Sequence, residues 1–190
     1  MREKCFLLGW PCRTVVVCGL FLAMSCGNNG EHGIRVGEGT RYVNNSGGQQ
    51  RIGLPDGSYV LIGDATVIVL AKDFGKGNRD LELDGEGMFE VNGGAGRPFV
   101  VRTGNLVIEL LDTLVQGPDK FRVDAVRKRA GEEVDLLTGR LRVVKSYHSD
   151  TDNEPEILAA GEMVMINREI DLMEKEKLSA EELEKVKAKF

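Results

Sequence analysis

Turn-forming residues divide most of this chain into short segments, and this division limits the folds that the chain can adopt. Between residues 51 and 170, groups of glycine, proline, aspartate and asparagine recur every 7 to 14 residues. The segments between them alternate polar and apolar residues, as in KFRVDAV (120–126) and RLRV (140–143), and none shows a sustained helical period. Short strands joined by regular turns indicate an all-β domain. The pattern leaves a sandwich, a barrel and a solenoid open, and we expect a short-stranded, β-solenoid-like domain or a β-sandwich.

The end of the sequence has a different pattern, typical of a short helix. In KLSAEELEKVKAKF (177–190), Ser179 and Glu182 have the spacing of a capping box, and Leu178 and Leu183 have that of a hydrophobic staple. Acidic residues come first and lysines last, which suits the helix dipole. We therefore expect a C-terminal tail and helix over 169–190. The helix either docks on its own domain, frays, or offers a site for a partner.

The beginning of the sequence resembles a processed leader. A basic start precedes an apolar run at 14–25, whose length as a helix is about 18 Å, against about 30 Å for a hydrocarbon core. The stretch LAMSC (22–26) resembles the lipobox of bacterial lipoproteins. This resemblance implies a signal peptide at 1–25 and acylation of Cys26, so that membrane lipid becomes a partner. An uncleaved anchor and a plain secretory signal are the alternatives.

Composition separates the next parts of the chain and excludes some functions. Residues 26–48 are rich in glycine and asparagine and read as a flexible tether, so we expect the β domain at 49–168. The net charge of −5 argues against nucleic acid as a partner, because phosphate binding needs a positive surface. All four cysteines lie within the first 26 residues, so no later disulfide or thiolate metal site is expected.

No catalytic set can be identified from the residues. The chain has two histidines, His32 and His148, and no nucleophile elbow or phosphate-binding motif. Many carboxylates leave a glycosidase pair open, although the few aromatic residues argue against it. Asp150, Asp152 and Glu154 have the spacing of calcium ligands, but Pro155 stands where that loop needs glycine. We expect a solvated hairpin loop there, and no enzyme activity, metal or cofactor.

An ordered set of motifs resembles the FecR-type domain, the periplasmic part of bacterial sensors that control iron-siderophore uptake. The motifs are LPDGS (54–58), LELDGEGMFEV (81–91), RPFVVRTG (97–104) and the later turns, and they extend from about Tyr42 to Ile166. The matching residues are Leu54, Pro55, Asp56, Gly57, Ser58, Gly85, Glu86, Phe89, Val91, Pro98, Phe99, Val101, Thr103, Thr113, Leu137, Gly139, Gly161 and Glu162. We interpret them as turn and core residues, with no active site among them.

The resemblance also has departures that bear on function. Asp112 replaces a glycine of the family pattern, and LVQGPDK (114–120) looks like an insertion. Only about 13 residues precede the apolar run, so the expected form is a stand-alone lipoprotein without the anti-sigma and C-terminal domains of family sensors. Gly27 after Cys26 favours the outer membrane, because inner-membrane retention is often associated with aspartate there.

Together these observations predict a non-enzymatic lipoprotein on the periplasmic face of a bacterial membrane. It would bind an envelope protein as a signalling module, with a link to TonB-dependent iron uptake as the implication of the family. A glycan- or cell-wall-binding lipoprotein is the alternative.

Overall fold

The computed structural model describes residues 39–93, 96–111 and 117–190. All of the described residues belong to one compact unit. The predicted signal peptide, Cys26, most of the tether and the motif residue Thr113 lie outside the described residues. Within the described part, no helix has the length and apolar content needed to cross a membrane.

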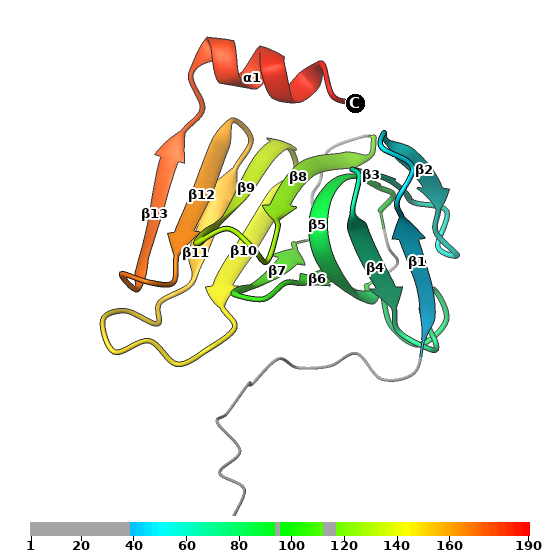
Figure 1. Cartoon of the computed structure of the whole chain (residues 1–190), viewed down its shortest axis with the longest axis horizontal. Helices are drawn as coiled ribbons and strands as arrows, with labels where there is room; N and C mark the ends of the chain where they lie inside the picture. Colours follow the sequence, from blue (N-terminus) through cyan, green and yellow to red (C-terminus); the bar gives the residue numbers. More distant parts are fainter. Residues whose placement is uncertain (1–38, 94–95, 112–116) are drawn as a thin grey trace, which may run out of the picture. The chain divides into compact units, whose positions relative to one another are not determined.

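The described residues form thirteen strands and one helix (Figure 1). The strands are β1 (Thr40–Asn44), β2 (Gln50–Gly53), β3 (Tyr59–Ile62), β4 (Thr66–Leu70), β5 (Asp80–Val91), β6 (Phe99–Arg102), β7 (Leu106–Leu110), β8 (Asp119–Ala125), β9 (Gly131–Thr138), β10 (Arg140–Lys145), β11 (Glu156–Ala159), β12 (Glu162–Asn167) and β13 (Leu172–Lys177), and the helix is α1 (Ala180–Lys187).

The long strand β5 belongs to two sheets. Its first half pairs with β4 and β6, giving sheet A in the order β1-β4-β5-β6-β7-β10-β11. Its second half pairs with β3 and β8, giving sheet B in the order β2-β3-β5-β8-β9-β12-β13. All neighbours are antiparallel except β5 and β6. Figure 1 shows β5 curving between β4 on one side and β8 on the other.

The bend of β5 occurs at Gly85, where the chain passes from sheet A to sheet B. Gly85 has a φ of 123°, and a Cβ atom there would lie 2.8 Å from the Cα of Thr66 on β4. Side chains rarely adopt this backbone conformation, and the approach of β4 leaves no space for one. Glycine therefore allows one strand to serve both sheets.

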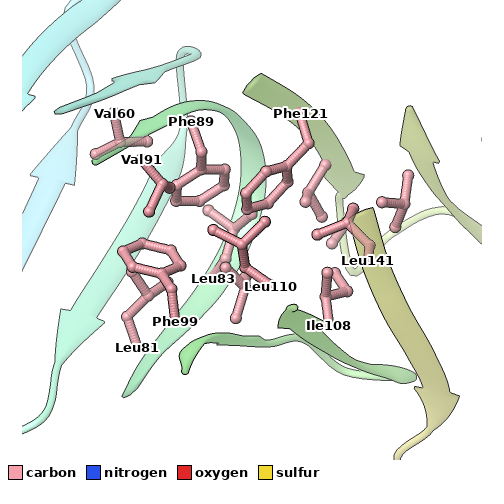
Figure 2. Close-up of a cluster of buried hydrophobic side chains, with 14 of the residues drawn as sticks. Val60, Leu81, Leu83, Phe89, Val91, Phe99, Ile108, Leu110, Phe121 and Leu141 are labelled. Atoms are coloured by element: carbon pink, nitrogen blue, oxygen red, sulfur yellow. The ribbon is translucent and has the colours of Figure 1, made fainter. Parts of the chain in front are cut away.

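The inner faces of the two sheets enclose the core. Phe89 stacks on Phe121 with ring centroids 4.9 Å apart, and Phe99 of sheet A lies edge-on to both rings. Figure 2 shows these rings among the leucine and valine side chains of neighbouring strands. Burying an aromatic or branched side chain contributes about 1.5–3 kcal/mol, and strand alternation supplies such a side chain at every second position.

The all-β fold with a short C-terminal helix is confirmed. The described strands form one connected sheet whose two halves face each other and share β5, so their arrangement is a sandwich that is nearly closed like a barrel and has no stacked solenoid rungs. The helix has the predicted capping box: Ser179 Oγ accepts from the Glu182 amide, and the Glu182 carboxylate accepts from the Ser179 amide at 2.9 Å.

Two predicted boundaries need correction. Strand β1 lies inside the predicted tether, so the domain begins by Thr40 and not at residue 49, because Tyr42 packs against the core. Strand β13 lies inside the predicted tail at 169–190. Its sequence LMEKEK hides the strand pattern, because most of its side chains are exposed at the edge of sheet B.

Candidate protein-binding surfaces

The LPDGS motif forms the turn between β2 and β3 and is held by a buried arginine. The Asp56 carboxylate accepts hydrogen bonds from the Ser58 amide at 3.0 Å and from Arg79 Nε at 2.8 Å. Arg79 is 3% exposed, donates to the Asn92 carbonyl at 2.7 Å, and lies 5.1 Å from the centre of the Phe99 ring. The motif is therefore a structural support that joins this turn to the core.

The other motif residues lie in the same framework. Leu54, Ser58, Gly85, Phe89, Val91 and Phe99 are buried, and Pro55 and Pro98 are exposed. Gly57, Gly139 and Gly161 occupy turns with positive φ. Thr103 Oγ1 donates to the buried Glu132, whose Oε1 also accepts from the Asn105 amide at 3.0 Å. Burial raises the pKa of Glu132 despite these hydrogen bonds.

One buried arginine on the outer face of sheet B gathers four carboxylates. Arg122 is 7% exposed. Its nitrogens contact Glu86 at 2.7 Å, Glu133 at 2.7 Å, Asp135 at 2.8 Å and Asp124 at 3.0 Å. Burial alone would lower the pKa of Arg122, but hydrogen bonds to these carboxylates hold it above its usual range. Burial raises the pKa of Asp135 to about 6.

The helix α1 covers this arginine cluster. Lys189 Nζ contacts Glu86 of β5 at 2.9 Å, and the Phe190 ring lies 5.4 Å from Lys120 Nζ of β8. Val186 of the helix is buried. Met88 of β5 is buried too, although it stands between Arg122 and Leu61 on the outer face of sheet B. The helix therefore docks on its own domain, over the outer face of sheet B at β5 and β8.

A second polar cluster joins the 146–155 loop to the β12–β13 turn. The Asp171 carboxylate accepts from Ser149 Oγ at 2.7 Å, from Tyr147 Oη at 3.0 Å and from Lys145 Nζ at 3.1 Å. The hydrogen bond from Ser149 is the main cause that holds the pKa of Asp171 well below its usual range. Asp171 has a φ of 51°, which aspartate tolerates better than most residues.

This cluster has the residue types of a serine–lysine dyad without its chemistry. Lys145 Nζ lies 2.8 Å from Ser149 Oγ, but it is also paired with Asp171. Lys145 and Ser149 are each 3% exposed. A nucleophile must reach substrate, and Ser149 is buried. In the same loop the Asp152 carboxylate accepts from the Glu154 amide at 2.8 Å. Across the described residues, no group of acidic, histidine or cysteine side chains is placed to hold a metal ion.

The two ends of the sandwich differ in how their edge strands are finished. At one end, β11 and β13 are edge strands, and Lys175 of β13 faces inward, opposite the buried Val164 of β12. Lys175 Nζ contacts Glu156 at 3.2 Å and donates to the Ile157 carbonyl at 3.3 Å. We name this end, formed by β11 and β13, the closed end.

One backbone amide at the closed end donates its hydrogen bond to a side chain. The Ala159 amide of β11 donates to Glu162 Oε2 at 2.8 Å. An inward-pointing charge and occupied edge groups are devices that prevent another strand from pairing with a sheet. The closed end is therefore protected against strand addition.

The edge strands β1 and β2 form the other end, which we name the open end. Alternate residues of an antiparallel strand direct their backbone groups to opposite sides. The Ala71 amide donates to the Asp80 carbonyl at 3.0 Å, so Ala71 directs its backbone groups toward β5. By the alternation, Thr66, Ile68 and Leu70 of β4 direct their amides and carbonyls toward β1. Their partners on β1 are Thr40, Tyr42 and Asn44, which leaves the backbone groups of Arg41 and Val43 on the free edge.

The same reasoning applies to β2. The Leu54 amide bonds the Ser58 carbonyl at 2.9 Å, so Ile52 and Gln50 are bonded to β3 and the backbone groups of Arg51 and Gly53 lie on the free edge. Among the described residues, no side chain or backbone group bonds these edge groups on β1 or β2. The inward side chains of the two strands include Tyr42 and Ile52, and none of them is charged.

The open end also carries exposed apolar and basic side chains. Val43 is 43% exposed and Tyr59, on β3 beside β2, is 44% exposed. The only charged residues of β1 and β2 are Arg41 and Arg51, although the chain as a whole is acidic. A second exposed apolar group, Met165, Ile170 and Leu172, lies at the β12–β13 hairpin. Edge groups, apolar surface and charge of one sign thus coincide at the open end.

The sequence did not reveal several of these features. Arg79, Arg122 and Asp171 stand in polar stretches, and their roles depend on partners that lie far along the chain. The strict alternation of KFRVDAV placed Arg122 on the face opposite the core, which was the available signal. The exposed faces of β1 and β13 gave no comparable signal.

Comparisons with known proteins agree with the motifs. The family model described as "FecR protein" matches residues 40–142, which is more than half of the chain. Two crystal structures of a "putative anti-sigma factor" from Parabacteroides distasonis ATCC 8503, at 2.50 and 1.65 Å resolution, have a TM-score of 0.61 and 27% identity to this chain. Each match covers 75% of this chain and 61% of that chain, so the chain spans less than two thirds of that protein. No curated protein matches.

Proposed function

The chain belongs to the FecR family, and from this membership we propose that it is a non-enzymatic signalling module that binds another protein of the bacterial cell envelope. The similarity to the "putative anti-sigma factor" of Parabacteroides distasonis supports a regulatory role. The family model matches residues 40–142, which lie in the β domain, and the role that we assign to this domain is recognition of a partner.

The open end is the observation that carries this proposal. Four edge residues, Arg41, Val43, Arg51 and Gly53, present backbone groups without partners among the described residues. Buried charges elsewhere in the domain have partners close by, as in the Arg79, Arg122 and Asp171 clusters. A domain that pairs its buried charges and leaves one end unprotected is suited to binding a protein rather than to transforming a small molecule.

The sequence gives the proposal a location. Acylation of Cys26 would attach the module to the periplasmic face of a membrane, and Gly27 favours the outer membrane. There its partner would be a sensor or a TonB-dependent transporter, which links the module to the regulation of iron uptake. This location rests on the resemblance of LAMSC to a lipobox.

Two experiments in intact cells test the proposal. Metabolic labelling with a fatty-acid analogue should mark the chain, and Cys26→Ser should lose both the label and the cleavage of the leader. Photo-crosslinking from a series of surface positions should recover a sensor or transporter. Binding to glycan arrays without any protein crosslink would contradict the proposal and favour a glycan- or cell-wall-binding lipoprotein.

A further inference from the structure

We propose that the free edge of β1 binds an extended, acidic segment of the partner protein by strand addition. This inference rests on the proposed function and names the surface and the chemistry of its partner. Strand addition uses main-chain hydrogen bonds for affinity and alternate side chains for specificity. Both elements are present on β1.

The backbone of β1 supplies the hydrogen bonds. Arg41 and Val43 each direct one amide and one carbonyl to the free edge, while Tyr42 between them is bonded to β4 and packs against the core. The neighbouring strand β4 is central in sheet A and pairs with β5 on its other side. The edge is therefore a short, preformed template held by a rigid strand.

The side chains of β1 select the partner. Arg41 and Val43 lie on the same outer face, beside the half-buried Val69 and Val67 of β4. The Arg41 side chain is exposed and forms no ion pair with a described residue, and Val43 is 43% exposed. A strand laid along β1 would place one side chain beside Arg41 and another beside Val43. Charge and polarity match when the first is acidic and the second is apolar.

A second copy of this chain fits the edge less well. Two β1 strands paired about a two-fold axis would bring two Arg41 side chains to one face without any acidic residue of β1 between them. Like charges close together on one sheet face oppose such a pair. An acidic segment of another protein removes this repulsion.

The edge β2 offers a matched control on the same end. Its free-edge residues are Arg51 and Gly53, but the Arg51 guanidinium already lies over the Tyr59 ring at 4.4 Å. Gly53 contributes no side chain. Substitution of Arg41 and substitution of Arg51 therefore each remove an arginine from an edge strand of the same end. Of these two edges, only β1 has an arginine without a described partner beside an exposed valine.

Amide hydrogen exchange on the full chain provides the first test. In the free protein, the amides of Arg41 and Val43 should exchange much faster than those of Tyr42 and Asn44. Slow exchange at Arg41 and Val43 would show that another part of the chain already covers the edge, and would overturn the inference.

Peptide binding provides the second test. The probes are a ten-residue peptide of alternating glutamate and valine and its lysine counterpart, with affinity followed by fluorescence anisotropy. The acidic peptide should protect Arg41 and Val43 from exchange, and Arg41→Glu should weaken it about tenfold and favour the lysine peptide. Val43→Pro removes an edge amide that would donate to the peptide, so it should also weaken binding. The variant should still fold, because edge positions tolerate proline. Equal effects of Arg51→Glu and Arg51→Pro, or protection at another surface, would overturn the inference.

The outcome in cells separates this inference from the proposed function. If crosslinks to a sensor or transporter persist in Arg41→Glu and Val43→Pro but disappear when Ile170 and Leu172 are replaced by serine, the partner binds the β12–β13 hairpin. The proposed function then stands and the inference about β1 fails. If no protein is crosslinked from any position, the proposed function fails as well.

Discussion

The closed end and the open end are made from the same kind of short edge strand but expose different chemistry. At the closed end, Lys175 points inward and caps the Ile157 carbonyl, and Glu162 caps the Ala159 amide. At the open end, the inward side chains are uncharged and the edge groups of Arg41 and Val43 have no described partner. Strand position alone therefore does not determine whether an edge is available. Two or three side chains decide it.

The two ends also depend on different parts of the framework. The open end is carried by β4 and β3, which meet at the bend of β5 beside Gly85. The closed end is reinforced by the Asp171 cluster and lies beside the strands under α1. Substitutions in each framework should affect the nearer end first, and this expectation makes the comparison testable.

The largest effect is expected from Gly85→Ala. The new methyl group would lie 2.8 Å from the Thr66 Cα, in a backbone conformation that alanine avoids. Strain and overlap together should lower the free energy of unfolding by about 3 kcal/mol or more. Because Thr66 belongs to β4, exchange should rise first at β1 and β4. Chemical denaturation and hydrogen exchange measure both effects.

Gly161→Ala is the matched control for this prediction. Gly161 has a φ of 84°, but a Cβ atom there meets nothing within 4 Å. Its cost should be about 1 kcal/mol, from backbone strain alone. Equal losses for the two variants would mean that the approach of β4 does not constrain the bend of β5.

A pH-dependent effect is expected from Asp135→Asn on β9. Burial raises the pKa of Asp135 to about 6, above its ordinary value of 3.8, so the folded state holds a proton that the unfolded state has released. The contribution of this group is therefore present below pH 4 and is lost as the pH rises through 6. Between pH 4 and pH 7, the free energy of unfolding of the variant should rise relative to that of the wild type by about 2–3 kcal/mol.

The control for Asp135→Asn must remove a negative charge without disturbing the charged groups that surround Asp135. Arg122 and Asp124 face it from β8, Glu133 lies beside it on β9, and Lys189 reaches the cluster from α1 through Glu86. Glu174→Gln, on the exposed face of β13, removes one negative charge without touching Arg122. Denaturation curves at several pH values should show the gain in Asp135→Asn alone. The same pH profile in both variants would assign the effect to net charge.

Asp171→Asn tests the reinforcement of the closed end. Asparagine tolerates the positive φ, but it leaves the ammonium of Lys145, which is 3% exposed, without its charged partner. We expect a melting temperature lower by a few degrees and faster exchange in the 146–155 loop and the β12–β13 hairpin. Asp152→Asn in the same loop should leave both unchanged. If exchange rises only at β1, the cluster does not reinforce the closed end.

The sequence predicted what local patterns determine. Alternation in KFRVDAV and the turn at Leu54–Ser58 specified strands and returns, and the capping box at Ser179 specified the helix. The edges depend on contacts between distant segments. Lys175 reads as one more charge in an exposed strand, and its inward position follows only from its register with Val164. Arg79 likewise gains its role from Asp56 and Asn92, which lie 23 and 13 residues away.

The smallest effect on stability, and the most direct comparison of the two ends, is expected from Lys175→Val. The ion pair with Glu156 is partly exposed, so its loss should change the free energy of unfolding by at most about 1 kcal/mol. The variant nevertheless removes the inward charge of β13 and uncaps the Ile157 carbonyl of β11. Sedimentation over a range of concentrations should then show self-association that the wild type lacks, because β13 loses an inward charge and the Ile157 carbonyl of β11 loses its cap. Glu176→Val removes a charge from the same strand on its outer face, opposite Met163, and should remain monomeric. If Lys175→Val is also monomeric, the inward lysine is not what protects this end, and the absence of such a lysine on β1 and β2 no longer argues that the open end receives a partner strand.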